Sequence, residues 1–307
     1  MRLVFAGTPA VAVPSLKALA ASAHEVDLVV TRTDAPLGRR RVLTPSPVAA
    51  AAEELGIETL RTARLDDTAT AEIGARRPDL GVIVAYGGLV REPLLSAPRL
   101  GWINLHFSLL PRWRGAAPVQ HALIAGDEQV GVSVFHLVAE LDAGDVIAEE
   151  AMRTPEDVSA GELLSTLADV GTGVLLAAVD ALASGTAVAR AQEGDVTYAP
   201  KLSIDDGRVR WDAPAAAVLG RIRGTTPEPG AHTEVAGMRL KILAARRSPD
   251  PSPRLNPGTL SLHEGRLLVG TADAPVVLDR VQPAGRSAMN AADWWRGLRV
   301  TSAVAGS

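Results

Sequence analysis

Short apolar runs alternate with helix-like segments through the first two-thirds of the chain. Helices are predicted at 13–22, at 47–56 and from Ser159 onward, where Ser159 and Glu162 form a capping box. Buried strands are predicted between and around them, at 2–7, 27–31, 80–86, 101–106 and 131–137. This alternation predicts an α/β fold with a Rossmann-like, doubly wound, mainly parallel sheet, whose ligands lie outside the carboxyl ends of the strands.

The sequence texture changes after Gly185. Residues 190–205 are polar and rich in turn formers, which is typical of a linker. One helix-like segment at 213–224 is then followed by short alternating runs, a pattern that favours a small β-barrel of the oligonucleotide-binding (OB) type. We therefore expect a Rossmann-like domain over 1–189 and an OB-like barrel over 206–307.

Composition limits the class of protein. At 307 residues with 47% hydrophobic and 21% charged residues, the chain suits two ordinary folded domains. It contains no Cys, which excludes disulfides, thiolate zinc sites and a Cys nucleophile. The first apolar run is interrupted by Gly7, Thr8 and Pro9, and no window reaches the roughly 18 consecutive apolar residues of a membrane helix. We expect a cytoplasmic protein without a membrane partner.

Charge is divided unevenly between the two parts. Residues 206–307 carry 14 Lys and Arg against 9 Asp and Glu, a net charge of +5, whereas residues 1–205 carry 17 against 26. A basic C-terminal part suggests an anionic partner such as nucleic acid, although an excess of solvated Arg is the alternative. Trp294 and Trp295 in the same part are expected to pack in a core rather than to stack on bases.

The first strand-to-helix turn argues against a dinucleotide. A dinucleotide fingerprint needs three glycines there, so that a pyrophosphate can approach the backbone. The stretch AGTPAVAVPS supplies only Gly7, and no Walker-type lysine loop occurs elsewhere. The predicted sheet therefore binds another kind of ligand.

Polar and backbone-restricting residues concentrate in INLHFSLLPRWRGAAPVQ, at 103–120. Asn104 and His106 are two apart on a predicted strand, so both side chains point to one face at its carboxyl end. An amide there can donate to a developing oxyanion, and an imidazole can exchange a proton near neutral pH. Asp142 in LDAGD is the leading candidate for fixing the imidazole tautomer. Capping or turn bonding would explain the same residues without catalysis.

Other polar residues have simpler interpretations. Arg112 and Arg114 follow the predicted strand and are candidates for holding an anionic group. His121 and His136 belong to no set with metal-ligand spacing, so we interpret them as structural or surface groups and predict no metal site.

Several motifs, taken together, resemble the methionyl-tRNA formyltransferase family of folate-dependent formyltransferases across essentially the whole chain. The Asn-x-His pair followed by SLLPRWRG, together with LDAGD, is typical of folate-dependent formyltransferases in general. The tRNA-specific branch is indicated by RWRGAAPVQ, TYAPKL and the C-terminal QPAGRSAM. Further matching stretches are FAGTPAVAVPSL, TPSPV, VIVAYG and GVSVFHLVAELDAGDVI.

This resemblance implies an activity. Members move a formyl group from 10-formyltetrahydrofolate, a co-substrate, to the α-amine of methionine on charged initiator tRNA. It also implies a catalytic trio of Asn104, His106 and Asp142. The implied folate-contacting residues are Ser108, Leu109, Leu110 and Pro111, with Val84, Ala85, Tyr86 and Gly87 at the end of the preceding strand.

The resemblance further implies a tRNA contact in the basic loop at 31–48. Arg39, Arg40 and Arg41 are its candidates for phosphate or base contacts, and a solvated loop is the alternative. The basic barrel becomes a candidate tRNA-binding domain. Initiator tRNA and folate are the expected partners, and no obligate protein partner is evident.

The chain departs from the family pattern at Phe107, where Gly or Ala is usual. As a strand neighbour of His106, its ring should face away from the Asn104–His106 face. Two other functions remain open: a formyltransferase for a small amine, and a non-catalytic folate- or tRNA-binding protein. The basic C-terminal part argues against the first, and the intact trio argues against the second.

Overall fold

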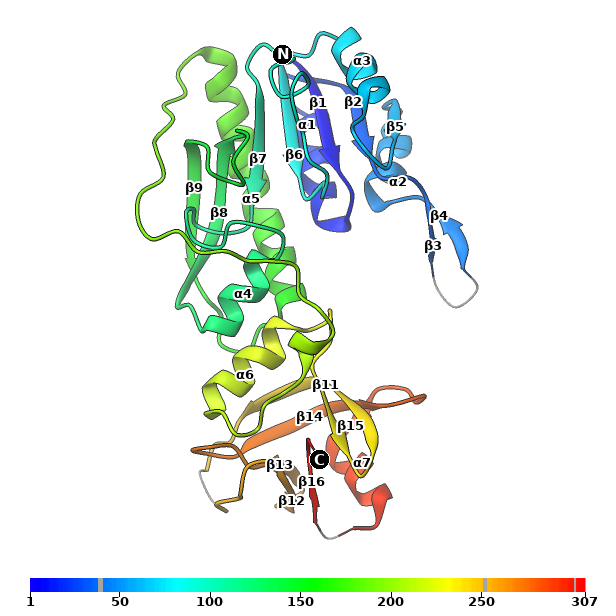
Figure 1. Cartoon of the computed structure of the whole chain (residues 1–307), viewed down its shortest axis with the longest axis vertical. Helices are drawn as coiled ribbons and strands as arrows, with labels where there is room; N and C mark the ends of the chain where they lie inside the picture. The colour runs from blue at the N-terminus through cyan, green and yellow to red at the C-terminus, as the bar shows by residue number, and fades with distance from the viewer. Residues whose placement is uncertain (38–40, 251–252, 301, 307) are drawn as a thin grey trace. The chain divides into compact units, whose positions relative to one another are not determined.

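The computed structural model (Figure 1) describes residues 1–37, 41–250, 253–300 and 302–306. These residues form two compact units. Unit 1 consists of Met1–Ala116, Val130–Met152 and Leu164–Ala199, and unit 2 of Ala117–Gln129, Arg153–Leu163 and Pro200–Ser307. Each unit therefore draws on several separate stretches of the chain.

A sheet of seven strands, in the order β5-β2-β1-β6-β7-β8-β9, forms the centre of unit 1. The five strands from β5 to β7 pair in parallel, and β8 pairs antiparallel with β7. This arrangement confirms the predicted Rossmann-like, mainly parallel sheet. Its strands are β1 (Arg2–Gly7), β2 (Glu25–Thr31), β5 (Thr59–Arg61), β6 (Leu80–Val84), β7 (Trp102–His106), β8 (Gln129–His136) and β9 (Val146–Arg153).

Local signals explain most helices that accompany this sheet. The predicted capping box is present at the start of α5, where the Ser159 backbone N–H donates to Glu162 Oε2 at 2.9 Å and the Glu162 N–H donates to Ser159 Oγ at 3.3 Å. Ser46 and Asp66 cap two further helices by accepting from backbone N–H groups. The helices are α1 (Val13–Ala20), α2 (Pro47–Glu54), α3 (Asp67–Ala75) and α5 (Ala160–Ser184), with a 3-10 turn at Ala10–Ala12.

The sheet is buried because β1 and β6 consist almost entirely of apolar residues. Close packing also requires Gly81 on β6, since a Cβ there would lie 2.1 Å from the Trp102 ring. Helix α5 is long and apolar enough to cross a membrane by length and composition alone. Its residues Leu163, Leu167 and Leu175 are nevertheless fully buried, as expected of the core helix of a folded domain.

A small antiparallel barrel dominates unit 2, in the strand order β10-β11-β14-β13-β12-β16. The bridge between Val235 and Ala305 joins the last strand back to the first, and the Gly306 N–H donates to the Glu234 carbonyl at 2.8 Å. The predicted C-terminal β-barrel is thus confirmed. Its strands are β10 (His232–Val235), β11 (Met238–Arg247), β12 (Thr259–His263), β13 (Arg266–Val269), β14 (Val276–Pro283), β15 (Met289–Asn290) and β16 (Ala303–Val304).

Three α-helices of unit 2 are α4 (Pro118–Ala125), α6 (Ala215–Gly224) and α7 (Ala291–Leu298), and a 3-10 turn spans Asp205–Gly207. Helix α4 packs closely on α6. Glycine at positions 220 and 224 permits this approach, since a Cβ there would lie 2.8 Å and 2.6 Å from an α4 carbonyl oxygen. On α7, Trp294 and Trp295 are buried in the barrel core, which confirms their predicted packing role.

Candidate functional site

Strand β7 brings Asn104 and His106 to one face of the sheet. Asn104 is in register with Ile83 of the parallel neighbour β6, and His106 with Ser133 of the antiparallel neighbour β8. His106 is only 5% exposed, and the Phe135 ring stands edge-on to it at 6.3 Å between centroids. The predicted pair therefore lies on β7, which is flanked by β6 and β8, and the imidazole is almost inaccessible to water.

The His106 imidazole has a defined tautomer. Its Nε2 lies 2.9 Å from the Trp113 carbonyl oxygen, and because a carbonyl can only accept, Nε2 carries the proton. Nδ1 lies 3.9 Å from Asp142 Oδ2, which accepts a hydrogen bond from the Gly115 N–H at 2.8 Å. The sequence pointed to Asp142 as the group that fixes the tautomer. In the structure the Trp113 carbonyl does so, because it accepts from Nε2 at 2.9 Å, whereas the 3.9 Å between Nδ1 and Asp142 Oδ2 is too long for a hydrogen bond.

Burial dominates the electrostatics of the imidazole. Desolvation lowers the pKa of His106 below its usual value, while the Asp142 carboxylate and the Trp113 carbonyl raise it by less. A neutral imidazole at pH 7 follows, with the proton on Nε2 and a lone pair on Nδ1. Asp142 is itself 8% exposed and has a positive φ of 47°, so its carboxylate is held beside His106 in a strained backbone conformation.

The Asn104 amide differs from the imidazole in its bonding. Within the described ranges of the chain, its side chain makes no hydrogen bond and is partly exposed. The amide hydrogens are thus available to a ligand, two residues from a buried base. Phe107, the residue that departs from the family pattern, is 7% exposed and buried next to His106 in the chain.

Two further predicted segments follow the paired strands β6 and β7. After β7, Ser108 Oγ donates to the Arg112 carbonyl at 2.6 Å, and Ser133 Oγ donates to the Ser108 carbonyl at 2.8 Å. These bonds make a tight turn of the predicted folate-contacting residues Ser108, Leu109, Leu110 and Pro111. The hydrogen of the Ser108 hydroxyl is therefore used within the protein, while its oxygen can still accept a hydrogen bond.

The end of β6 has its own backbone geometry. Ala85 has a φ of 47° and Gly87 a φ of 73°, so the chain turns sharply as it leaves the strand. Thr8 Oγ1 donates to the Tyr86 carbonyl at 3.3 Å, and Arg32 Nη2 donates to the Gly87 carbonyl at 2.6 Å. Burial raises the pKa of the Tyr86 phenol. Because Val84 is paired with Leu105, this segment and the turn after β7 begin side by side.

Residues 1–179 match the formyl transferase family model, and residues 201–299 match the model of the formyl transferase C-terminal domain. The chain belongs to the formyl transferase family. The resemblance inferred from its motifs is thereby confirmed.

Relatives of this formyl transferase are found among both sequences and structures. The methionyl-tRNA formyltransferase of Clavibacter sepedonicus is 62% identical over 305 residues, covering 99% of this chain and 100% of the relative. The sugar 3N-formyl transferase WlaRD, crystallised in the presence of dTDP and 5-N-formyl-THF, has a TM-score of 0.70 at 12% identity and covers 94% of this chain and 99% of its own. HypX from Aquifex aeolicus in complex with tetrahydrofolic acid has a TM-score of 0.63 at 16% identity. The match covers 98% of this chain and 48% of the HypX chain. At such identities the two structures show a shared fold only.

The two arginines after β7 have different surroundings in this formyl transferase. Arg114 is 7% exposed, and its guanidinium donates to Glu140 Oε1 at 3.0 Å and to Gln192 Oε1 at 2.7 Å. The interpretation of Arg114 as an anion-binding group was wrong, because Glu140 and Gln192 of the same chain occupy its guanidinium. The Arg112 guanidinium lies over the Trp113 ring, 5.1 Å from its centroid. No motif or spacing in the sequence singled out Gln192.

The predicted tRNA-contacting loop is described only in part. Arg39 and Arg40 lie outside the described residues. Arg41 is exposed, with a φ of 49°, directly before β4 (Val42–Thr44), which pairs antiparallel with β3 (Ala35–Leu37). The short β3–β4 hairpin therefore carries Arg41 at the surface of unit 1.

His121 and His136 are the two histidines interpreted from the sequence as structural or surface groups. The His121 ring donates through Nε2 to the Pro200 carbonyl at 3.0 Å, and burial lowers the pKa of His136. In the part of the chain that the structure describes, no group of three or more His, Cys, Asp or Glu residues could hold a metal ion.

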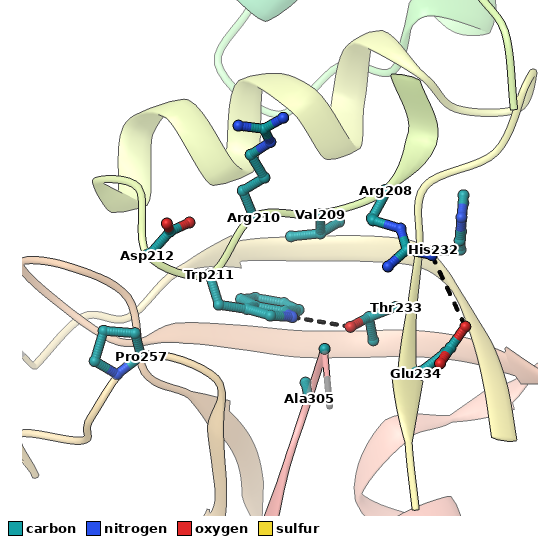
Figure 2. A pocket seen from close by; sticks show the side chains of 11 residues that line it. Arg208, Val209, Arg210, Trp211, Asp212, His232, Thr233, Glu234, Pro257 and Ala305 are labelled. Carbon is teal, nitrogen blue, oxygen red and sulfur yellow. Dashed lines mark hydrogen bonds and ion pairs between the residues drawn. The ribbon is translucent and has the colours of Figure 1, made fainter. Parts of the chain in front are cut away.

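A cavity of about 270 Å³ lies in unit 2 and contains none of the predicted site residues (Figure 2). Trp211 points into it and donates from its indole N–H to Thr233 Oγ1 at 3.0 Å. Arg208 faces Glu234 across 4.0 Å. The cavity therefore lies beside the point where the barrel closes, and two pairs of its polar side chains interact with each other.

Proposed function

We propose that the chain transfers the formyl group of 10-formyltetrahydrofolate to the free α-amino group of methionyl initiator tRNA. The product is N-formylmethionyl-tRNA, which serves translation initiation in the cytoplasm. The observation that carries this proposal is the 62% identity to a methionyl-tRNA formyltransferase over essentially the full length of both chains. Identity of that extent covers the sheet that holds Asn104 and His106 as well as the barrel.

The site geometry supports a direct transfer. The amine nitrogen attacks the formyl carbon, negative charge collects on the formyl oxygen, and the bond from that carbon to the folate nitrogen then breaks. The Asn104 amide, which has no partner within the described residues, donates to the developing oxyanion. His106 Nδ1 takes a proton from the attacking amine and returns it to the departing folate nitrogen. Asp142, 3.9 Å from Nδ1, stabilises the imidazolium formed in between.

Binding of the two substrates is divided between different surfaces in this proposal. The turn at Ser108–Pro111 and the segment Val84–Gly87 contact the folate through backbone and apolar surface. Arg41, with Arg39 and Arg40, and the barrel with its net charge of +5 contact the tRNA. The chemistry needs an oxyanion donor and a base. In this proposal Asn104 supplies the first and His106 the second, and neither role requires a metal.

A formyl-transfer assay with 10-formyltetrahydrofolate tests the proposal. Charged initiator tRNA and small amine acceptors, including an amino-sugar nucleotide, are offered separately. We expect product on the tRNA and little on the small amines. Robust product on a small amine with none on the tRNA would overturn the proposed acceptor.

Salt dependence distinguishes the two binding surfaces. With several phosphate contacts, the affinity for tRNA should fall by about 10³-fold or more between roughly 50 and 200 mM salt. Folate affinity should change little over the same range. An equal loss for both substrates would contradict the proposed division of the surfaces.

A further inference from the structure

Gln192 lies 50 residues after Asp142 in the chain. It contacts the loop at 137–145, between β8 and β9, which carries Asp142. Its Nε2 donates to two backbone carbonyls of that loop, those of Asp142 and Gly144, each at 2.8 Å. Its Oε1 accepts from Arg114 Nε at 3.1 Å and from Nη2 at 2.7 Å. Both hydrogens and both acceptor positions of the amide are therefore used, which only Gln or Asn can achieve.

Arg114 completes the same network from the other side. Its Nη1 donates to Glu140 Oε1 at 3.0 Å, at the start of the loop. The next residue, Gly115, donates its N–H to the Asp142 carboxylate at 2.8 Å. The loop is therefore held by a charge-assisted contact at Glu140, by the carbonyls of Asp142 and Gly144, and by the carboxylate itself.

The segment 190–199 is in turn fixed to other parts of unit 1 along its backbone. Arg190 exchanges two hydrogen bonds with Val146, each at 2.8 Å. At the other end, the Arg114 N–H donates to the Thr197 carbonyl at 2.9 Å, and the Ala199 N–H donates to the Arg114 carbonyl at 2.8 Å. Gly115 is required at this crossing, since its φ is 125° and a Cβ would lie 2.8 Å from the Ala199 carbonyl oxygen. Gln192 thus projects from a well-anchored strip of backbone.

We infer that Gln192 is a positioning residue: its amide, oriented by Arg114, holds the Asp142 loop so that the carboxylate stays beside His106. This inference rests on the proposed function, because it assigns Asp142 a role in formyl transfer. The positive φ of Asp142 gives the physical reason for such a support, since a strained loop residue keeps its conformation only when its surroundings hold it. A displaced carboxylate stabilises the imidazolium of His106 less.

The first test compares variants of Gln192 in full-length protein. Gln192→Ala removes the amide, and Gln192→Glu keeps an acceptor for Arg114 but places oxygen against the two loop carbonyls. We expect both to lower kcat by about 10- to 100-fold, the range for small misplacements of catalytic groups, with KM for 10-formyltetrahydrofolate nearly unchanged. Gln129→Ala is the matched control. Gln129 is exposed at the start of β8 and has no side-chain hydrogen bond within the described ranges.

A double-mutant cycle separates positioning from general stability. If Gln192 acts through Asp142, adding Gln192→Ala to Asp142→Ala should lower kcat little further. The acid limb of kcat/KM should move to lower pH in Gln192→Ala, as in Asp142→Ala, because His106 loses the charge that favours its protonation. Circular dichroism and melting temperatures confirm that the compared variants are folded, and Gln192→Glu serves if Gln192→Ala does not fold.

Failure of the inference is distinct from failure of the proposed function. If Asp142→Ala turns over like the unmodified protein, the proposed site assignment fails. If Asp142→Ala is slow but the Gln192 variants keep full kcat and an unmoved acid limb, only the inference is overturned. An equal loss from Gln192→Ala in both backgrounds overturns it as well, because Gln192 would then act independently of Asp142.

Discussion

Two histidines of this molecule are buried to the same extent and bonded in similar ways, yet only His106 belongs to the proposed catalytic site. His106 in unit 1 and His232 in unit 2 are each 5% exposed. Each donates to a backbone carbonyl, His106 to Trp113 at 2.9 Å and His232 to Gly230 at 3.1 Å. Burial and a carbonyl partner therefore do not by themselves define a catalytic imidazole.

The neighbours make the difference. His106 has a buried carboxylate 3.9 Å from its second nitrogen and the amide of Asn104 on the same strand face. The carboxylate near His232 is Glu234, which is exposed and faces Arg208. An imidazole can act as a catalytic base when a desolvated carboxylate nearby stabilises the positive charge that it gains on protonation. An oxyanion donor must also lie beside it.

The largest expected effect separates the two histidines directly. His106→Ala should lower kcat by about 10²- to 10⁴-fold, because it removes the proposed general base. His232→Ala should leave kcat unchanged and lower the free energy of unfolding by about 1–3 kcal/mol, since the Gly230 carbonyl loses its buried donor. Steady-state kinetics and denaturant titration of both variants check this. Equal kinetic losses would remove the distinction between the two regions.

Asn104→Ala should come next in size. Loss of one oxyanion donor typically lowers kcat by about 10²- to 10³-fold. KM for folate should change little, because the donor acts on charge that appears only in the transition state. Single-turnover kinetics measure the chemical step. A raised KM at normal kcat would instead identify Asn104 as a substrate-binding residue.

Asp142→Asn should give a smaller loss together with a shifted pH profile. The Asp142 charge raises the pKa of His106, so its removal lowers that pKa further. The active imidazole is neutral, and the acid limb of kcat/KM should therefore move to lower pH, with kcat about 10- to 100-fold lower. The profile is measured over the acid range in both proteins. A limb that moves upward would contradict the assignment of the charge effect.

The smallest expected effect lies in the barrel. Thr233→Val removes the acceptor of the Trp211 indole and should lower the free energy of unfolding by about 1–3 kcal/mol. Formyl transfer should be unaffected. Thermal unfolding and the standard assay check both statements. A large fall in kcat would show that the cavity at Trp211 takes part in the reaction.

Much of the fold was predictable because its signals are local. The apolar runs of β1 and β6, the capping box at Ser159 and the alternation of β11–β14 need only neighbouring residues. Helix α3 was not predicted, because the stretch at 67–75 is short and weakly periodic, and its start depends on the Asp66 cap. The close packing of α4 on α6 depends on two glycines whose spacing alone indicates no partner.

The site was predictable in the same unequal way. Asn104 and His106 follow from strand periodicity, so their shared face could be inferred from the sequence. The Trp113 carbonyl reaches His106 only because the turn after β7 folds back on it, and Gln192 meets the Asp142 loop across 50 residues of chain. Contacts set by tertiary placement leave no periodic trace, which is also why Arg114 was misinterpreted.

Nitrogen-15 NMR of the histidine side chains, followed through a pH titration, tests the central claim most directly. His106 should be neutral at pH 7 with its proton on Nε2, and should titrate below the usual histidine pKa of about 6.5, because burial outweighs the Asp142 charge. Asp142→Asn should lower that pKa further. A proton on Nδ1 at pH 7, or titration above the usual value, would contradict the account.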